Sequence, residues 1–132
     1  RSNHVANVME LVFSPDGRRL ATPSWDGTVG LWDVPARRLI RQLRGHGGGV
    51  NGAAFSPDGR TLATGAAEDV VRLWNVRTGL EVATLPGPRG GAWSLAFSPD
   101  GRWLLAGGWN GTLRLWAAPQ PEPVAGRTRP GP

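Results

Sequence analysis

The sequence predicts an all-β fold in which one four-stranded antiparallel unit occurs three times. The pentapeptide Ser-Pro-Asp-Gly-Arg recurs every 42 residues, beginning at Ser14, Ser56 and Ser98. A Trp follows 19 residues after the Phe that precedes each copy, at Trp32, Trp74 and Trp116. No stretch of the 132 residues shows the apolar periodicity of a helix. The repeat therefore sets the architecture.

Each unit is predicted to contain four short strands separated by turns. In the first unit these strands cover roughly 8–13, 18–23, 28–34 and 38–43, and the later units follow at the same positions plus 42 and plus 84. Ser-Pro-Asp-Gly closes the first hairpin, because Pro presets φ and Gly accepts a positive φ. Asp26-Gly27 and Asn110-Gly111 are signals of the second turn, and Gly79 marks a third.

Four antiparallel strands in about 42 residues match one blade of a β-propeller. The expected blades are 1–43, 44–85 and 86–127, so the chain carries three. The last strand of the third blade is degenerate, because Pro121 and Pro123 interrupt it. Residues 119–132 are rich in Pro and are expected to form an extended tail.

The motifs resemble those of the WD-repeat β-propeller family over residues 4–127. Gly45-His46 opens the second unit, and Ser-Pro-Asp-Gly lies in the middle of all three. The third strands end in Leu-Trp-Asp, Leu-Trp-Asn and Leu-Trp-Ala, at residues 31–33, 73–75 and 115–117. The resemblance covers most of the chain and implies a ring of blades that acts as a scaffold for protein partners.

The resemblance also implies a structural hydrogen-bond network in each unit, formed by a His, a Ser or Thr, a turn Asp and the Trp. The first unit offers the full set, with His4, Thr22, Asp26 and Trp32. The second offers His46, Thr64 and Trp74, with Glu68 at the Asp position. The third retains Trp116, but Pro88 and Ala106 replace the His and the Thr.

In the resembling family, partners bind at the upper rim of the ring. The corresponding positions are the residue before the turn Asp and one residue of the first strand, namely Trp25, Trp109, Met9, Asn51 and Trp93. Exposed aromatic side chains near Arg are typical of an interaction hot spot. The alternative is that these Trp side chains pack between blades or at a seam between chains.

Catalysis, metals and cofactors are not expected. The chain has no Cys, which excludes disulfides and thiol chemistry, and its two His lie 42 residues apart. The types His, Thr and Asp occur together as in a hydrolase triad, but they recur at the period of the fold beside a Trp. That recurrence indicates a structural network, and the chain is predicted not to be an enzyme.

The formal net charge is +5, and all fifteen basic residues are Arg. They are scattered along the chain, so nucleic acid is not expected as a partner, although an Arg surface that binds an acidic polymer or nucleic acid stays an alternative. No run of about 18 apolar residues exists, so no membrane span is expected, and there is no signal-peptide pattern. A cytoplasmic location is expected.

Three blades cannot close a ring, since propellers contain about four to eight. Each uncovered blade face would expose roughly 320 Å² of mainly apolar area, estimated from strand spacing and rise. We expect a homo-oligomer, in which two chains giving six blades are favoured over three giving nine, or the missing blades of a longer parent chain of which this is the C-terminal part. The expected function is a non-catalytic interaction scaffold. The alternatives are a self-assembling structural fragment without a ligand and the regulatory part of a larger enzyme.

Overall fold

The computed structural model describes residues 8, 10–108 and 111–117, and these residues form strands and turns without a helix. The first sheet contains β1 (Val12–Phe13), β2 (Arg19–Pro23), β3 (Val29–Asp33) and β4 (Arg38–Leu43). The second contains β5 (Val50–Phe55), β6 (Thr61–Ala66), β7 (Val70–Asn75) and β8 (Glu81–Pro86). The third contains β9 (Ser94–Phe97), β10 (Trp103–Gly107) and β11 (Leu113–Ala117). Every described strand pair is antiparallel.

Ten of the eleven strands begin and end within two residues of the predicted positions. The first strand is the exception, because β1 covers only Val12–Phe13 and a single bridge joins Val8 to Ser24 further back. Leu11 between them is exposed, so packing does not hold this segment in the sheet. The predicted fourth strand of the third unit, 122–127, lies outside the described residues.

The Ser-Pro-Asp-Gly turn has the same geometry in all three units. In the first, the Gly17 amide donates to the Ser14 carbonyl over 2.9 Å, and the Ser14 hydroxyl donates to Asp16 over 2.7 Å. The backbone amide of Arg19 in turn donates to the Ser14 hydroxyl oxygen. Gly17 has φ of 73°, a left-handed conformation that favours glycine. The other two turns repeat these bonds, and their glycines have φ of 73° and 74°.

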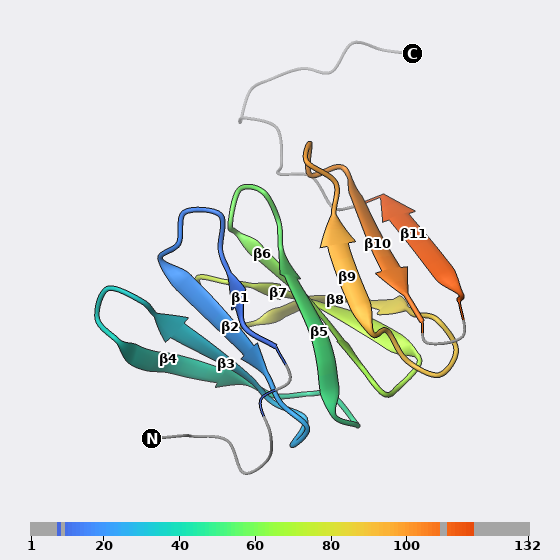
Figure 1. The fold of residues 1–132 in the computed structure, drawn as a ribbon, viewed down its shortest axis with the longest axis horizontal. Helices are drawn as coiled ribbons and strands as arrows, with labels where there is room; N and C mark the ends of the chain where they lie inside the picture. Colours follow the sequence, from blue (N-terminus) through green and yellow to red (C-terminus); the bar gives the residue numbers. More distant parts are fainter. Residues whose placement is uncertain (1–7, 9, 109–110, 118–132) are drawn as a thin grey trace.

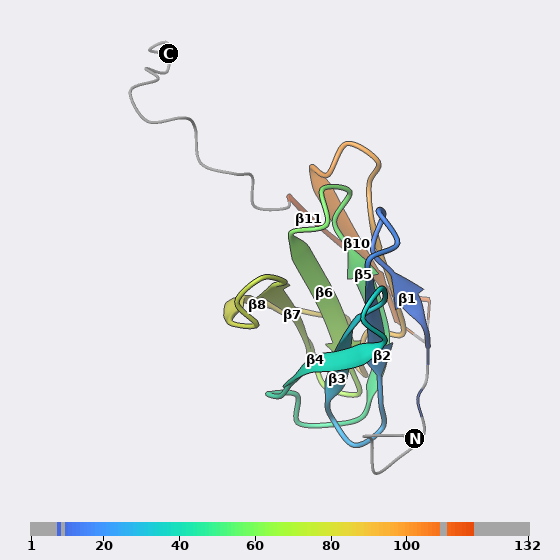
Figure 2. The same cartoon turned by 90° about the vertical axis from the view of Figure 1, so that its left-hand side faces the viewer.

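The three sheets lie side by side in chain order and form an open arc (Figure 1). The β1–β2, β5–β6 and β9–β10 turns lie along one edge of the arc, and the β2–β3 and β6–β7 turns lie along the opposite edge (Figure 1). The first strands of neighbouring sheets contact one another, β1 with β5 and β5 with β9. Seen from the side, β8 lies on the side of the molecule away from β1 (Figure 2). The all-β class and the partial propeller are thus confirmed.

The apolar core is divided between the two seams that join the sheets. At the first seam, Leu31 and Leu43 pack with Phe55, Leu62 and Trp74 of the second sheet. At the second seam, the buried residues are Ala63, Val71, Leu73, Ala92, Leu104 and Ala106. The second sheet is therefore covered on both faces, as a propeller blade must be.

The two end faces of the arc carry the same apolar pattern without a neighbour among the described residues. Phe13 is 57% exposed, whereas Phe55, its equivalent one repeat later, is 8% exposed. On the opposite end, Leu115 is 60% exposed, whereas the equivalent Leu31 and Leu73 are buried. Apolar side chains at equivalent repeat positions are thus buried inside the arc and exposed at its ends.

Candidate functional site

The second unit contains a continuous hydrogen-bond network that joins two strands to the loop before the sheet. The Trp74 indole N–H donates to the Thr64 hydroxyl over 2.8 Å. The Thr64 hydroxyl lies 2.6 Å from His46 Nε2, and His46 Nδ1 lies 2.8 Å from the Glu68 carboxylate. Thr64 is fully buried, and the rings of His46 and Trp74 lie 6.4 Å apart. Glu68 here makes the bond to His that the turn Asp of the motif is expected to make.

The donor and acceptor roles in this network fit a neutral His46. Thr64 accepts from Trp74, so its own hydroxyl hydrogen is free to donate to Nε2, and Nδ1–H then donates to Glu68. Burial lowers the pKa of His46 below its usual 6.5, although the Glu68 carboxylate opposes that shift. Burial alone would raise the pKa of Glu68, but hydrogen bonds from Gly47 and His46 lower it instead. At neutral pH, the pair is thus a neutral imidazole and a carboxylate.

Arg72 and Glu81, which are not part of the motif, extend this network. Arg72 donates to Glu68 over 3.4 Å and to Glu81 over 2.8 Å, which joins the β6–β7 turn to β8. Asp69, beside Glu68, makes a separate contact and accepts a hydrogen bond from the Gly90 amide. Sequence reasoning missed these contacts, because they join segments without a shared motif.

The described residues of the other two units contain parts of the same network. In the first, the Trp32 indole donates to Thr22 over 3.0 Å, and Asp26 accepts from the backbone amide of Thr28 over 2.9 Å. His4 lies outside the described residues. In the third, Ala106 has no hydroxyl, and Trp116 is half-buried against the second apolar seam. Asn110 also lies outside the described residues.

Three of the five predicted rim residues meet at the start of β5. A Cβ added to Gly49, just before this strand, would lie 3.1 Å from Trp25 Cδ1. A Cβ added to Gly52 would lie 3.3 Å from the Trp93 carbonyl. The half-buried Asn51 stands between these glycines. The close approach thus places both Trp residues beside one short stretch of backbone.

Both of these Trp side chains are open to solvent. Trp25 is 58% exposed and lies in the β2–β3 turn, and Trp93 is 46% exposed and directly precedes β9. They come from different sheets, the first and the third, with β5 of the second between them. The remaining two predicted rim residues, Met9 and Trp109, lie outside the described residues.

Among the described residues, no three His, Cys, Asp or Glu side chains are grouped so that they could hold a metal ion. The same residues contain no helix that is long and apolar enough to cross a membrane.

The fold and the repeated networks define an open arc of propeller blades. The chain belongs to the WD-repeat family, because the family model described as "WD domain, G-beta repeat" matches residues 1–33, 37–75 and 79–117, which is most of the chain. The second and third matches each begin ahead of the last strand of one sheet and end with the third strand of the next. Each sequence repeat therefore ties neighbouring blades together covalently.

Several curated proteins are similar to parts of this chain. The human U5 small nuclear ribonucleoprotein 40 kDa protein is 39% identical over 49 residues, which is 37% of this chain and 14% of that protein. The WD repeat-containing protein VIP3 of Arabidopsis thaliana is 46% identical over 39 residues, 30% of this chain and 12% of that protein. The human U4/U6 small nuclear ribonucleoprotein Prp4 is 50% identical over 34 residues, 26% of this chain and 6% of that protein. The matched segments thus span a small part of these relatives.

Proposed function

We propose that this chain is a non-catalytic scaffold that binds a protein or peptide through the edge that carries Trp25 and Trp93. The observation that carries the proposal is the placement of these two exposed Trp residues beside the backbone of Gly49 and Gly52, with Asn51 between the two glycines in the sequence. Large amphipathic rings beside a polar side chain provide both apolar contact area and orientation for a peptide. Membership of the WD-repeat family supports an interaction role.

The names of the relatives agree with a role in an assembly. Two of them are named as small nuclear ribonucleoprotein components. For this chain, that similarity supports a scaffold within a larger complex and leaves the partner to be identified by experiment. The cytoplasmic location expected from the sequence stays a prediction.

We also propose that further blades cover the two end faces of the arc. Phe13 at one end and Leu113 and Leu115 at the other are exposed, although the equivalent residues of the second sheet are buried. A second copy would give six blades and two further copies nine, and blades of a longer chain would serve equally. The apolar character of both ends supports this completion, because solvated patches of this kind are costly.

The rim proposal predicts separate effects on binding and on stability. Peptides selected from a random display library against the immobilised chain should bind the Trp25→Ala/Trp93→Ala variant at least about tenfold more weakly, a loss of about 1.4 kcal/mol or more. The thermal midpoint should change little, because both rings are exposed. Titration calorimetry and thermal unfolding measure the two quantities.

Trp103→Ala is the matched control, because Trp103 is 45% exposed and lies outside the predicted rim. It should leave peptide affinity within about twofold of the unsubstituted chain. Selected peptides that bind the double variant as tightly as the unsubstituted chain would refute the rim assignment. A large fall in thermal midpoint would show instead that the indoles are part of the core.

A further inference from the structure

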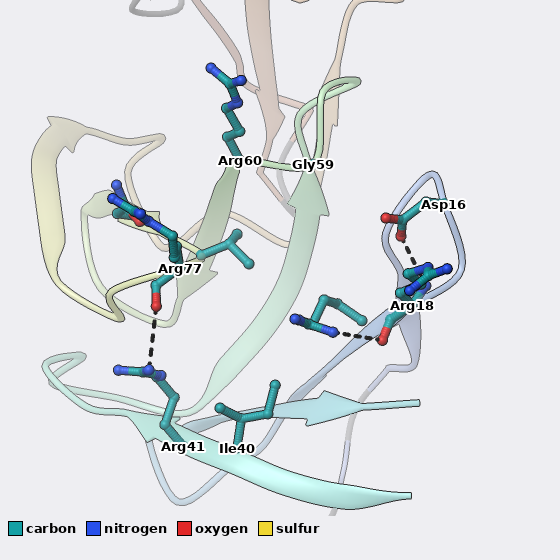
Figure 3. A pocket seen from close by; sticks show the side chains of 10 residues that line it. Asp16, Arg18, Ile40, Arg41, Gly59, Arg60 and Arg77 are labelled. Atoms are coloured by element: carbon teal, nitrogen blue, oxygen red, sulfur yellow. Dashed lines mark hydrogen bonds between the residues drawn. The ribbon is translucent and has the colours of Figure 1, made fainter. Parts of the chain in front are cut away.

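A basic pocket lies on the edge of the arc opposite the Trp rim. It has a volume of about 590 Å³ and lies between the first and second sheets. Its lining comes from the start of β2, from β4, from the end of β7 and from the β1–β2, β5–β6 and β7–β8 turns. It includes Arg18, Arg19, Arg41, Arg60 and Arg77. Figure 3 shows Arg18 and Asp16 on one side of the pocket and Arg60 and Arg77 on the other. Five arginines from four separate segments of the sequence thus surround one cavity.

Most of this positive charge is not neutralised by the described residues. Arg19 lies 3.8 Å from the Asp33 carboxylate, but no salt bridge to a described carboxylate forms at Arg18, Arg60 or Arg77. Asp16 is the one acidic side chain of the lining, and it accepts hydrogen bonds from Ser14 and from the Arg18 amide. Those bonds, the Arg18 amide first, hold the pKa of Asp16 below its usual range. The pocket therefore keeps an excess of positive charge at neutral pH.

Arg41 organises the floor of the pocket. Its guanidinium donates to the carbonyl oxygens of Thr78 and Arg77, which ties β4 to the β7–β8 turn. Its Nε is buried without an acceptor. A Cβ at position 79 would lie 2.5 Å from Arg41 Cδ, so Gly79 is needed for this contact. The turn that carries Arg77 is thus held in place by a specific interaction.

The basic lining is particular to this seam and is not a feature of the repeat. One repeat later, Thr61 stands at the position of Arg19 and Ala83 at that of Arg41, while Pro119 replaces Arg77. Only Arg18 and Arg60 belong to the recurring Ser-Pro-Asp-Gly-Arg motif, whose third copy ends in Arg102. The repeat does not require the other three arginines, so their convergence is a feature of this seam and not of the blade motif.

We propose that this pocket binds an acidic peptide segment of a protein partner, through a surface separate from the Trp rim. Guanidinium groups form bidentate, charge-assisted bonds with carboxylates, and the cavity volume lies within the usual range for ligand sites. Ile40 and Val76 in the lining provide contact for one apolar side chain of the peptide. The lining contains no aromatic ring, whereas proteins that bind single-stranded nucleic acid stack bases on such rings. The chemistry therefore favours a peptide over RNA.

Fluorescence anisotropy with a labelled peptide of Glu and Asp around a central Leu tests the proposal. This probe should bind the unsubstituted chain, and binding should weaken as NaCl rises from about 50 to about 500 mM. Arg60→Gln/Arg77→Gln should weaken it at least about tenfold, because each lost charge-assisted bond accounts for a substantial part of the affinity. Both arginines are exposed, so thermal unfolding should show a retained fold.

The controls separate this site from the rim and from general charge attraction. Arg102→Gln/Arg114→Gln removes the same two charges from exposed positions of the third sheet outside the pocket lining, and should change affinity less than about twofold. Trp25→Ala/Trp93→Ala should leave acidic-peptide binding intact. The two sites are thus tested separately, and a negative result for the pocket leaves the rim proposal standing. The proposal is overturned if the chain does not bind the probe, if the Gln/Asn version of the peptide binds equally well, or if oligouridine binds more tightly with the same dependence on Arg60 and Arg77.

Discussion

Phe55→Ala is expected to lower the free energy of unfolding by about 3–5 kcal/mol. Phe55 is 8% exposed and lies in the seam where the second sheet packs against the first. Removing its ring leaves a cavity lined by residues that belong to two sheets, so relaxation of one sheet cannot fill it. Chemical denaturation followed by Trp fluorescence measures the loss.

Phe13→Ala is the matched comparison, because Phe13 occupies the same repeat position and is 57% exposed in the arc. In dilute solution it should lower the free energy of unfolding by no more than about 1 kcal/mol. With rising protein concentration the cost should grow, since a further blade then covers this face. A cost that stays small at every concentration would contradict the proposal that this face is covered.

Thr64→Val is expected to have the next largest effect, about 1–3 kcal/mol for each buried group that is left unpaired. The substitution preserves shape but removes the hydroxyl that joins Trp74 Nε1 to His46 Nε2. Calorimetric unfolding measures the change. Thr61→Val, at the half-buried start of the same strand β6, is the control and should have little effect. Equal stability of the two variants would show that the network contributes nothing.

The same network gives the stability a defined pH dependence. Because the folded pKa of His46 lies below the unfolded value of 6.5, the unfolded state binds more protons just below that pH. The contribution of His46 is thus fully present above pH 6.5 and is lost as the pH falls toward the folded pKa. Glu68, whose pKa lies below its usual 4.5, adds a second loss below pH 4.5. His46→Gln should remove the first loss and leave a smaller second one, because the Gly47 amide and Arg72 still lower the pKa of Glu68.

The strands and turns were predictable because their signals are local. Pro and Gly fix the backbone of the Ser-Pro-Asp-Gly turn within four residues, and the same hydrogen bonds then recur in each sheet. The short β1 was not predictable from the pattern. Its extent depends on what packs against Leu11 and Val12, which is a tertiary property.

The sequence pattern assigned Glu68 to the Asp position of the motif, but it did not predict which side chains surround Glu68. The contacts of Glu68 with Gly47 and Arg72 depend on how the loop before β5 folds over the β6–β7 turn. The basic pocket was not predicted from the sequence. Its arginines are scattered along the chain, and only the packing of the first sheet against the second brings Arg18, Arg41 and Arg77 together.

The solution mass of the purified chain, measured by multi-angle light scattering over a range of concentrations, tests the central claim most directly. A single chain has a mass of 14.0 kDa. If the apolar end faces must be covered, the folded species should have a mass of two or three chains, and Leu115→Glu should disrupt the association. A monodisperse, cooperatively folded species of 14.0 kDa at every concentration would contradict the account.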